Sequence, residues 1–197
     1  KYFTEFWPSD NTDPIERLFI QWGFSQVFPA KTMCAHVTTW NKNSSVKFRT
    51  DVAMMCKLGF DIKLADMSKD DETYCRTAVQ NYNRLKPVVL EGDMYRLVSP
   101  YGSNHTSTMY VGKDNDKGAV FAFDIHPRYA EKILPVRLQG LDADKMYRVK
   151  EINLMPGANS SLSGNGEVFS GEFLMNVGLN LFTAQQLNSR VIEVVAE

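Results

Sequence analysis

The segment Asp13-Pro14-Ile15-Glu16 carries three start signals for a helix within four residues. Aspartate is a favoured N-cap, proline suits the first helical position, and a glutamate at the third position completes a capping box. Apolar residues then recur at helical spacing up to Gly23, namely Ile15, Leu18, Phe19 and Trp22. The segment therefore predicts a helix that begins after Asp13 and ends at Gly23.

Downstream of this helix, strand-like and helical patterns alternate as far as Pro87. Residues 27–30 are interpreted as a short strand and residues 59–64 as a second one, while Phe48, Val52 and Met55 fit one helical face. Residues 68–71 resemble another capping box and predict a helix that Pro87 ends, with a buried stripe at Cys75, Ala78, Val79, Tyr82 and Leu85. This alternation is typical of an α/β layer with a parallel sheet, although two or three strands are too few to close a barrel.

From about Glu91 onward the pattern changes to short strands separated by turn-forming residues. The predicted strands are residues 94–98, 107–111, 119–125, 133–138, 147–152 and 189–195. Many short strands at this spacing are typical of an antiparallel β-sandwich.

The composition excludes several classes of function. The 197 residues include 44% hydrophobic residues, enough for a core, and the net charge of −1 gives no electrostatic signature of binding to nucleic acid or an anionic membrane. No apolar run approaches the roughly 20 residues of a membrane-spanning helix. Three cysteines and three histidines are scattered along the chain, so we expect no metal site and no cofactor.

The densest set of chemically capable side chains lies just before the first helix, in residues 5–14. Two carboxylates, Asp10 and Asp13, lie three positions apart and close to Trp7. Glycoside cleavage needs a carboxylic acid that protonates the leaving oxygen, and sugars stack on aromatic rings. Asp13 is explained by helix capping, whereas Asp10 has no such role, although it could cap the turn of residues 9–12. On the residues alone, both a catalytic and a turn-capping role for Asp10 stay open.

Several further motifs follow in order along the chain. They are FWPSDNTDPIER at residues 6–17, QWGFS and FPA at 21–25 and 28–30, AHVT at 35–38, RTDVAM and LGFD at 49–54 and 58–61, GDMYRLVSP at 92–100, and SGEFLMN at 170–176. The first resembles the SDxTDxxxR segment of glycoside hydrolase family 36 α-galactosidases, and the others resemble later segments of that family in the same order. The resemblance covers nearly the whole chain.

The resemblance implies a fold in two parts. Residues 1–90 would be the C-terminal segment of a (β/α)₈ TIM barrel, about strands 6 to 8, and residues 91–197 an antiparallel β-sandwich domain. Asp10 would follow the sixth barrel strand as the general acid/base of a retaining α-galactosidase. The nucleophile of that family comes from a Lys-Trp-Asp type of motif, which does not occur in this chain. The chain alone is therefore expected to be inactive.

The resemblance also implies partners for the intact enzyme. The substrate would be an α-galactoside oligosaccharide, contacted by Trp7, Asn11 and Asp13, with residues 56–59 as a weaker candidate segment. A homo-oligomer of the intact protein stays open, as do cytoplasmic, periplasmic and secreted locations. The first residue, Lys1, reads as the middle of a longer protein.

Two other functions stay open. One is a non-catalytic carbohydrate-binding or stabilising β-module, with an aromatic patch drawn from Tyr95, Tyr101, Tyr110 and Phe123. The other keeps the fold but transfers galactose to a second sugar, as raffinose synthases do.

Overall fold

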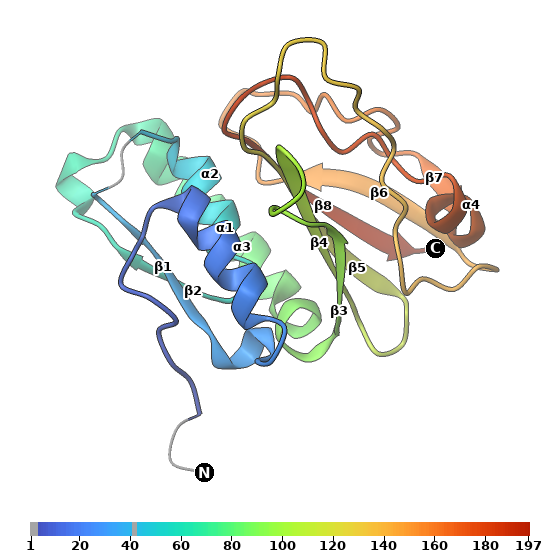
Figure 1. The fold of residues 1–197 in the computed structure, drawn as a ribbon, viewed down its shortest axis with the longest axis horizontal. Helices are drawn as coiled ribbons and strands as arrows, with labels where there is room; N and C mark the ends of the chain where they lie inside the picture. The colour runs from blue at the N-terminus through green and yellow to red at the C-terminus, as the bar shows by residue number, and fades with distance from the viewer. Residues whose placement is uncertain (1–3, 41–42) are drawn as a thin grey trace.

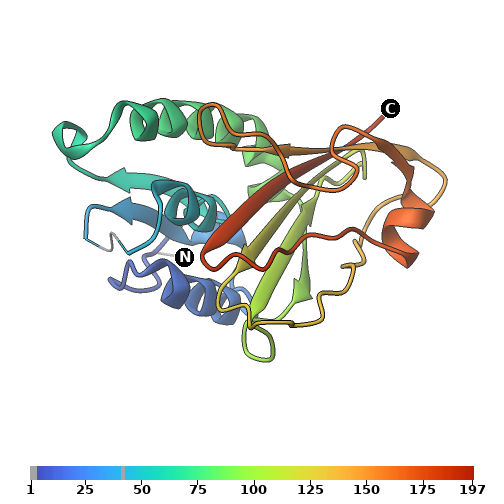
Figure 2. The same ribbon diagram turned by 90° about the horizontal axis from the view of Figure 1, so that it is seen from above.

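The computed structural model describes residues 4–40 and 43–197, which form stacked layers (Figures 1 and 2). Three helices occupy the middle: α1 (Pro14–Phe24), α2 (Val46–Ala53) and α3 (Lys69–Glu91). On one side of them lie two parallel strands, β1 (Cys34–Thr38) and β2 (Lys57–Asp61), and on the other side lies a six-stranded antiparallel sheet. Two short 3₁₀ helices, Ala30–Thr32 and Leu64–Asp66, lie in the connections.

The antiparallel sheet has the order β3-β4-β5-β8-β6-β7. Its strands are β3 (Asp93–Val98), β4 (His105–Val111), β5 (Lys117–Asp124), β6 (Met146–Ile152), β7 (Val168–Ser170) and β8 (Asn188–Ala196). A short helix, α4 (Gly171–Asn176), follows β7 directly. The last strand therefore enters the sheet between β5 and β6, and this placement joins the early and late parts of the region.

Both faces of this sheet are covered, so its central strands are apolar on both sides. Tyr110 and Phe121 face the helices and pack with residues of α2 and α3, whereas Met109 and Val120 belong to a second core on the opposite face. Because successive side chains of a strand alternate between faces, β4 and β5 contribute to both cores and are almost entirely buried.

The helix caps agree with the predictions from the sequence. The Asp13 carboxylate accepts hydrogen bonds from the backbone N–H groups of Ile15 and Glu16, and the Ser68 hydroxyl accepts one from Asp71. These interactions satisfy N–H groups that have no partner inside the helix.

Two of the predicted elements are wrong in extent. Residues 27–30 are no strand, because the N–H groups of Val27 and Phe28 bond back to Phe24, and the strand follows later at β1. Pro87 does not end α3, which continues to Glu91. Val88, Val89 and Leu90 are buried in the core, and we attribute the continuation to that burial, which offsets the backbone hydrogen bond that proline cannot donate.

The antiparallel sheet predicted for the second region is confirmed, but its second layer differs from the expected one. Residues 133–138 form only an isolated bridge, between Val136 and Leu179, instead of a strand. Within the described part of the chain, loops and α4 cover the outer face of the sheet, with Leu138, Leu162, Leu174 and Leu181 buried there. Long connections with a few buried leucines thus take the place of a second facing sheet.

Candidate functional site

Three extended segments near the start of the chain run parallel and end at the same edge. Phe6 forms a parallel bridge with Met33, supported by backbone bonds of 2.9 Å from Phe6 to Thr32 and from Cys34 to Phe6. β1 in turn pairs in parallel with β2. Because their carboxyl ends point the same way, the loops that follow these segments gather at one edge. The segment with Trp7 and Asp10 is one of these loops.

The two faces of β1 have different chemistry. Ala35 and Val37 are buried in a core that includes Ala53 of α2. The alternate positions are polar, and the parallel register aligns His36 with Gly59 and Thr38 with Asp61. On this polar side the ring of Trp7 meets the ring of His36 edge to face, with centroids 4.5 Å apart.

The loop that carries Asp10 is held at both ends by hydrogen bonds. The buried Arg17 guanidinium donates to the Ser9 carbonyl at 3.0 Å and to the Cys34 carbonyl at 3.1 Å, which ties α1, the loop and β1 together. Burial lowers the pKa of Arg17 from its ordinary value. The hydroxyls of Thr12 and Thr38 lie 2.9 Å apart in a buried contact.

The four residues predicted for the site lie together on this loop, but in different states. Asp13 is the helix cap, and the Asn11 side-chain oxygen accepts from the Asp13 N–H at 2.9 Å. Trp7 is 54% exposed. Asp10 is exposed, and its carboxylate makes no hydrogen bond or ion pair within residues 4–40 and 43–197. Of these four residues, only Asp10 therefore combines an anchored loop with an exposed, unpaired carboxylate.

His36 is a member of this site that the sequence analysis did not select. Burial lowers its pKa from 6.5, Arg17 lowers it further, and the Asp61 and Asp10 carboxylates act in the opposite direction. Its Nδ1 atom is buried without a partner among the described residues. The sequence does contain a sign of this position. His36 lies between Ala35 and Val37, and in a strand this alternation places the polar residue on the face away from the helices.

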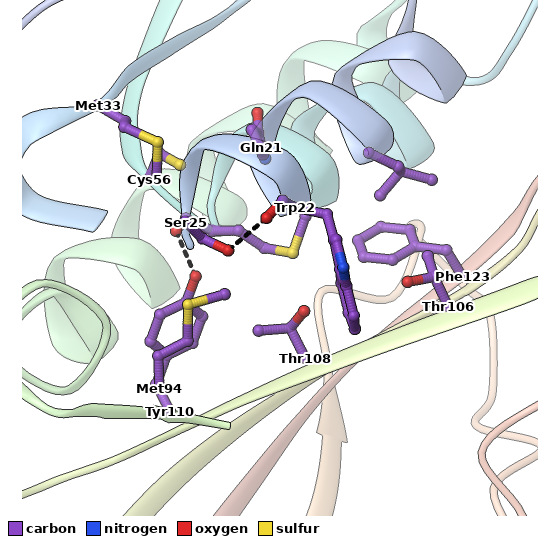
Figure 3. Close-up of a pocket in the computed structure, with 12 residues that line it drawn as sticks. Gln21, Trp22, Ser25, Met33, Cys56, Met94, Thr106, Thr108, Tyr110 and Phe123 are labelled. Carbon is purple, nitrogen blue, oxygen red and sulfur yellow. Dashed lines mark hydrogen bonds between the residues drawn. The ribbon is translucent and has the colours of Figure 1, made fainter. Parts of the chain in front are cut away.

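A cavity between the middle helices and the antiparallel sheet is too small for a sugar. It is lined by Gln21, Trp22 and Ser25 of the α1 region and by Thr108 and Tyr110 of β4, among others (Figure 3). Its volume of about 10 Å³ is that of roughly one water molecule. The Tyr110 hydroxyl donates across this boundary to the Met55 carbonyl at 2.8 Å. The cavity is a packing gap where the two layers meet.

The aromatic patch predicted for a carbohydrate-binding module is not present as a surface. Tyr110 and Phe123 are only 2% and 1% exposed, and both belong to the core against the helices. Tyr101 is 68% exposed and packs its ring against Phe19 of α1. This finding removes the main residue-level argument for the module.

Metal and membrane sites were sought in the same part of the chain. No cluster of three or more histidine, cysteine, aspartate or glutamate residues there has a geometry that could hold a metal ion. None of the helices formed by residues 4–40 and 43–197 has the length and apolar character needed to cross a bilayer.

Two family descriptions match this chain. Residues 1–92 match "Melibiase", and residues 105–194 match "Glycosyl hydrolase family 36 C-terminal domain". The chain is 33% identical to Alpha-galactosidase 2 of Hypocrea jecorina over 98% of its own length, and 30% identical to Alpha-galactosidase 1 of Pediococcus pentosaceus over 90%. It spans only 25% and 23% of these relatives, about a quarter of each.

Solved structures give the same result. The α-galactosidase AgaB of Geobacillus stearothermophilus superimposes with a TM-score of 0.86 at 28% identity, covering 100% of this chain and 26% of that one. Substituted forms of AgaA from the same organism, in complex with raffinose and with stachyose, give TM-scores of 0.86 and 0.85 at 27% and 28% identity. These two cover 100% and 98% of this chain, and 26% of each AgaA chain.

Proposed function

Because the chain belongs to glycoside hydrolase family 36, we propose that it is the C-terminal part of a retaining α-galactosidase that removes terminal α-galactosyl residues from oligosaccharides. In this proposal residues 1–90 complete a (β/α)₈ barrel, as about its strands 6 to 8. Residues 91–197 form the β-domain that follows. The parallel order of Phe6, β1 and β2 with intervening helices supports the first assignment.

Asp10 is the general acid/base of this proposal. The observation that carries it is an exposed, unpaired carboxylate on a loop that Arg17 anchors at the carboxyl edge of parallel strands. Active sites of β/α barrels lie at this edge. Asp10 would protonate the departing glycosidic oxygen and then remove a proton from the attacking water.

The second carboxylate would come from a part of the enzyme outside this chain. Retention of configuration requires a nucleophile roughly 5 Å from the acid/base, and the family motif that supplies it does not occur in residues 1–197. This chain would thus contribute half of the catalytic pair. Trp7, Asn11 and Asp13 are proposed to contact the sugar, although Asp13 also caps α1.

Raffinose and stachyose, named for two of the similar structures, suggest the class of substrate. We propose short α-galactosides of this kind. The exposed ring of Trp7 supports the proposal, because an aromatic face beside the acid/base can stack against a sugar ring.

The decisive experiment compares Asp10→Ala with the unaltered enzyme in the longer protein that contains this chain. Hydrolysis of melibiose, which has a poor leaving group, should fall by about 10² to 10⁴-fold, and that of an activated aryl α-galactoside should fall less. Glu16→Ala, a change of another exposed carboxylate in the first turn of α1, serves as the matched control and should leave both rates unchanged. Equal rates for Asp10→Ala and the control would contradict the assignment.

Transfer of galactose to a second sugar is the remaining alternative. The same loop chemistry serves both reactions, because the acceptor is either water or a sugar hydroxyl. Product analysis with melibiose and excess sucrose distinguishes them: both reactions release glucose, but a hydrolase also releases free galactose, whereas a transferase joins the galactose to sucrose as a trisaccharide.

A further inference from the structure

We propose that His36 is a sugar-positioning residue of the site, accepting a hydrogen bond at Nε2 from a hydroxyl of the galactosyl ring that Asp10 serves. The inference rests on the proposed function and adds a residue of β1 to a site otherwise built from one loop. It depends on the placement of the ring, on the different environments of its two nitrogens, and on the groups around it.

The ring of His36 lies on the face of β1 that points away from the helices. Its position on β1 alternates with Ala35 and Val37, which face α2, so its side chain leaves the strand on the polar side. There it contacts Trp7 edge to face at 4.5 Å. The Asp10 carboxylate is close enough for its charge to act on the imidazole. His36 thus contacts the proposed aromatic platform and lies within electrostatic range of the proposed acid.

The two ring nitrogens of His36 are not equivalent. Nδ1 is shielded from solvent and has no hydrogen-bond partner in the described part of the chain, whereas Nε2 is not among the buried, unpaired atoms there. The proposal therefore assigns the ligand contact to Nε2. The residue opposite in the parallel register is Gly59, which adds no side chain that could cover this nitrogen.

A small cavity lies beside β1 on the side of the helices. It has a volume of about 10 Å³, enough for one water molecule, and is lined by His36, Gln21 and Arg17 among others. Gln21 also has an unpaired buried atom, its side-chain oxygen. In the proposal the proton of the neutral imidazole resides on the buried Nδ1, and Nε2 keeps its lone pair.

The charges around the ring favour this neutral state. Burial is the largest influence on His36 and lowers its pKa, and the nearby Arg17 guanidinium does the same. The Asp61 and Asp10 carboxylates oppose them with smaller effects. A neutral imidazole with a free Nε2 is a hydrogen-bond acceptor, and sugar hydroxyls are donors that match it.

The test uses two substitutions that each keep one of the two nitrogen positions, made in the longer protein. His36→Gln retains a polar group near the Nε2 position and should keep KM for an aryl α-galactoside within about threefold. His36→Asn retains only the Nδ1 position and should raise KM about five- to tenfold with little change in kcat, as expected for one lost neutral hydrogen bond. The reverse order, with Asn tolerated and Gln impaired, would assign the contact to Nδ1, and equal KM values for the two variants would mean that neither nitrogen contacts the sugar. Either result would overturn the proposal.

Monodeoxy galactosides identify the contact without relying on the size of that effect. One of the 2-, 3-, 4- or 6-deoxy aryl galactosides should bind the unaltered enzyme more weakly than the parent galactoside does. His36→Asn should bind that deoxy sugar and the parent galactoside equally well. If every deoxy sugar loses the same factor in both proteins, His36 contacts no hydroxyl. Asp10→Ala is measured in parallel, and calorimetric binding of galactose provides a readout that needs no turnover. If Asp10→Ala keeps the turnover of the unaltered enzyme, the catalytic assignment of Asp10 is refuted. If His36→Asn binds galactose as tightly as the unaltered enzyme, only the proposal for His36 is refuted.

Discussion

Asp13 has two proposed roles, as the N-cap of α1 and as a contact to the sugar, and two substitutions distinguish them. One carboxylate oxygen accepts from the N–H groups of Ile15 and Glu16, each at 3.0 Å. Asp13→Ala should therefore lower the free energy of unfolding by about 1 kcal/mol, and Asp13→Asn, which keeps a capping oxygen, should change it little. Urea denaturation measures both. If Asp13→Asn leaves stability intact but raises KM, the residue also contacts the sugar; a stable Asp13→Ala would contradict the cap.

His36 should make stability depend on pH. Its pKa in the folded chain lies below the ordinary 6.5, so the unfolded chain binds more protons as the solution is acidified. The contribution is present above about pH 6.5 and is lost as the pH falls through the folded-state pKa. Melting temperatures between pH 8 and pH 5 should thus fall more for the unaltered protein than for His36→Gln, which has no imidazole. Parallel curves for the two proteins would exclude this linkage.

At the scale of elements, a buried carboxylate joins the helices to the antiparallel sheet. Asp51 of α2 is fully buried and accepts from Lys47 at 2.5 Å, from Tyr74 of α3 at 2.8 Å and from Ser189 of β8 at 2.7 Å. Asn153, after β6, donates to it at 3.0 Å. Burial and the nearby Asp51 charge raise the pKa of Tyr74 well above its usual value. Side chains of α2, α3 and β8 and of the residue that follows β6 thus share one acceptor.

Removing this acceptor should be costly. Asp51→Ala leaves the Lys47 ammonium and the Tyr74 hydroxyl without their partner in a dry environment, and we expect a loss of about 3–5 kcal/mol in the free energy of unfolding. The control is Glu72→Ala, which breaks the exposed i,i+4 pair with Arg76 and should cost under about 1 kcal/mol. Chemical denaturation of both variants gives the comparison, and equal losses would rule out the buried network as a main link between the layers.

The elements also show where sequence patterns succeed. The ends marked by Asp13 and Ser68 were predictable because capping is decided by residues three or four positions apart. The end of α3 was not, because Pro87 is overruled by the burial of Val88 to Leu90 against a sheet formed later in the chain. β7 and α4 are short and were missed, since three to six residues give too little periodicity to recognise.

At the scale of the whole molecule, we expect the 197-residue chain alone to release no galactose from an aryl α-galactoside. Three parallel segments cannot close a barrel around the sugar, and the proposed nucleophile lies outside them. The measurement is galactose release by the isolated chain beside the longer protein at equal concentration. Sustained turnover by the chain alone would refute the division of the catalytic pair.

The sequence by itself determined the family, the helix starts, most strands of the antiparallel sheet and the loop that holds Trp7, Asp10, Asn11 and Asp13. These features depend on neighbours in the chain or on motifs in a fixed order. Only the tertiary structure decided that Arg17 anchors this loop, that His36 adjoins it, that Asp51 links the layers and that loops cover the outer face of the sheet. Each of these depends on residues distant in sequence becoming buried together, and the cost of burying a polar group without a partner selects the contacts they make.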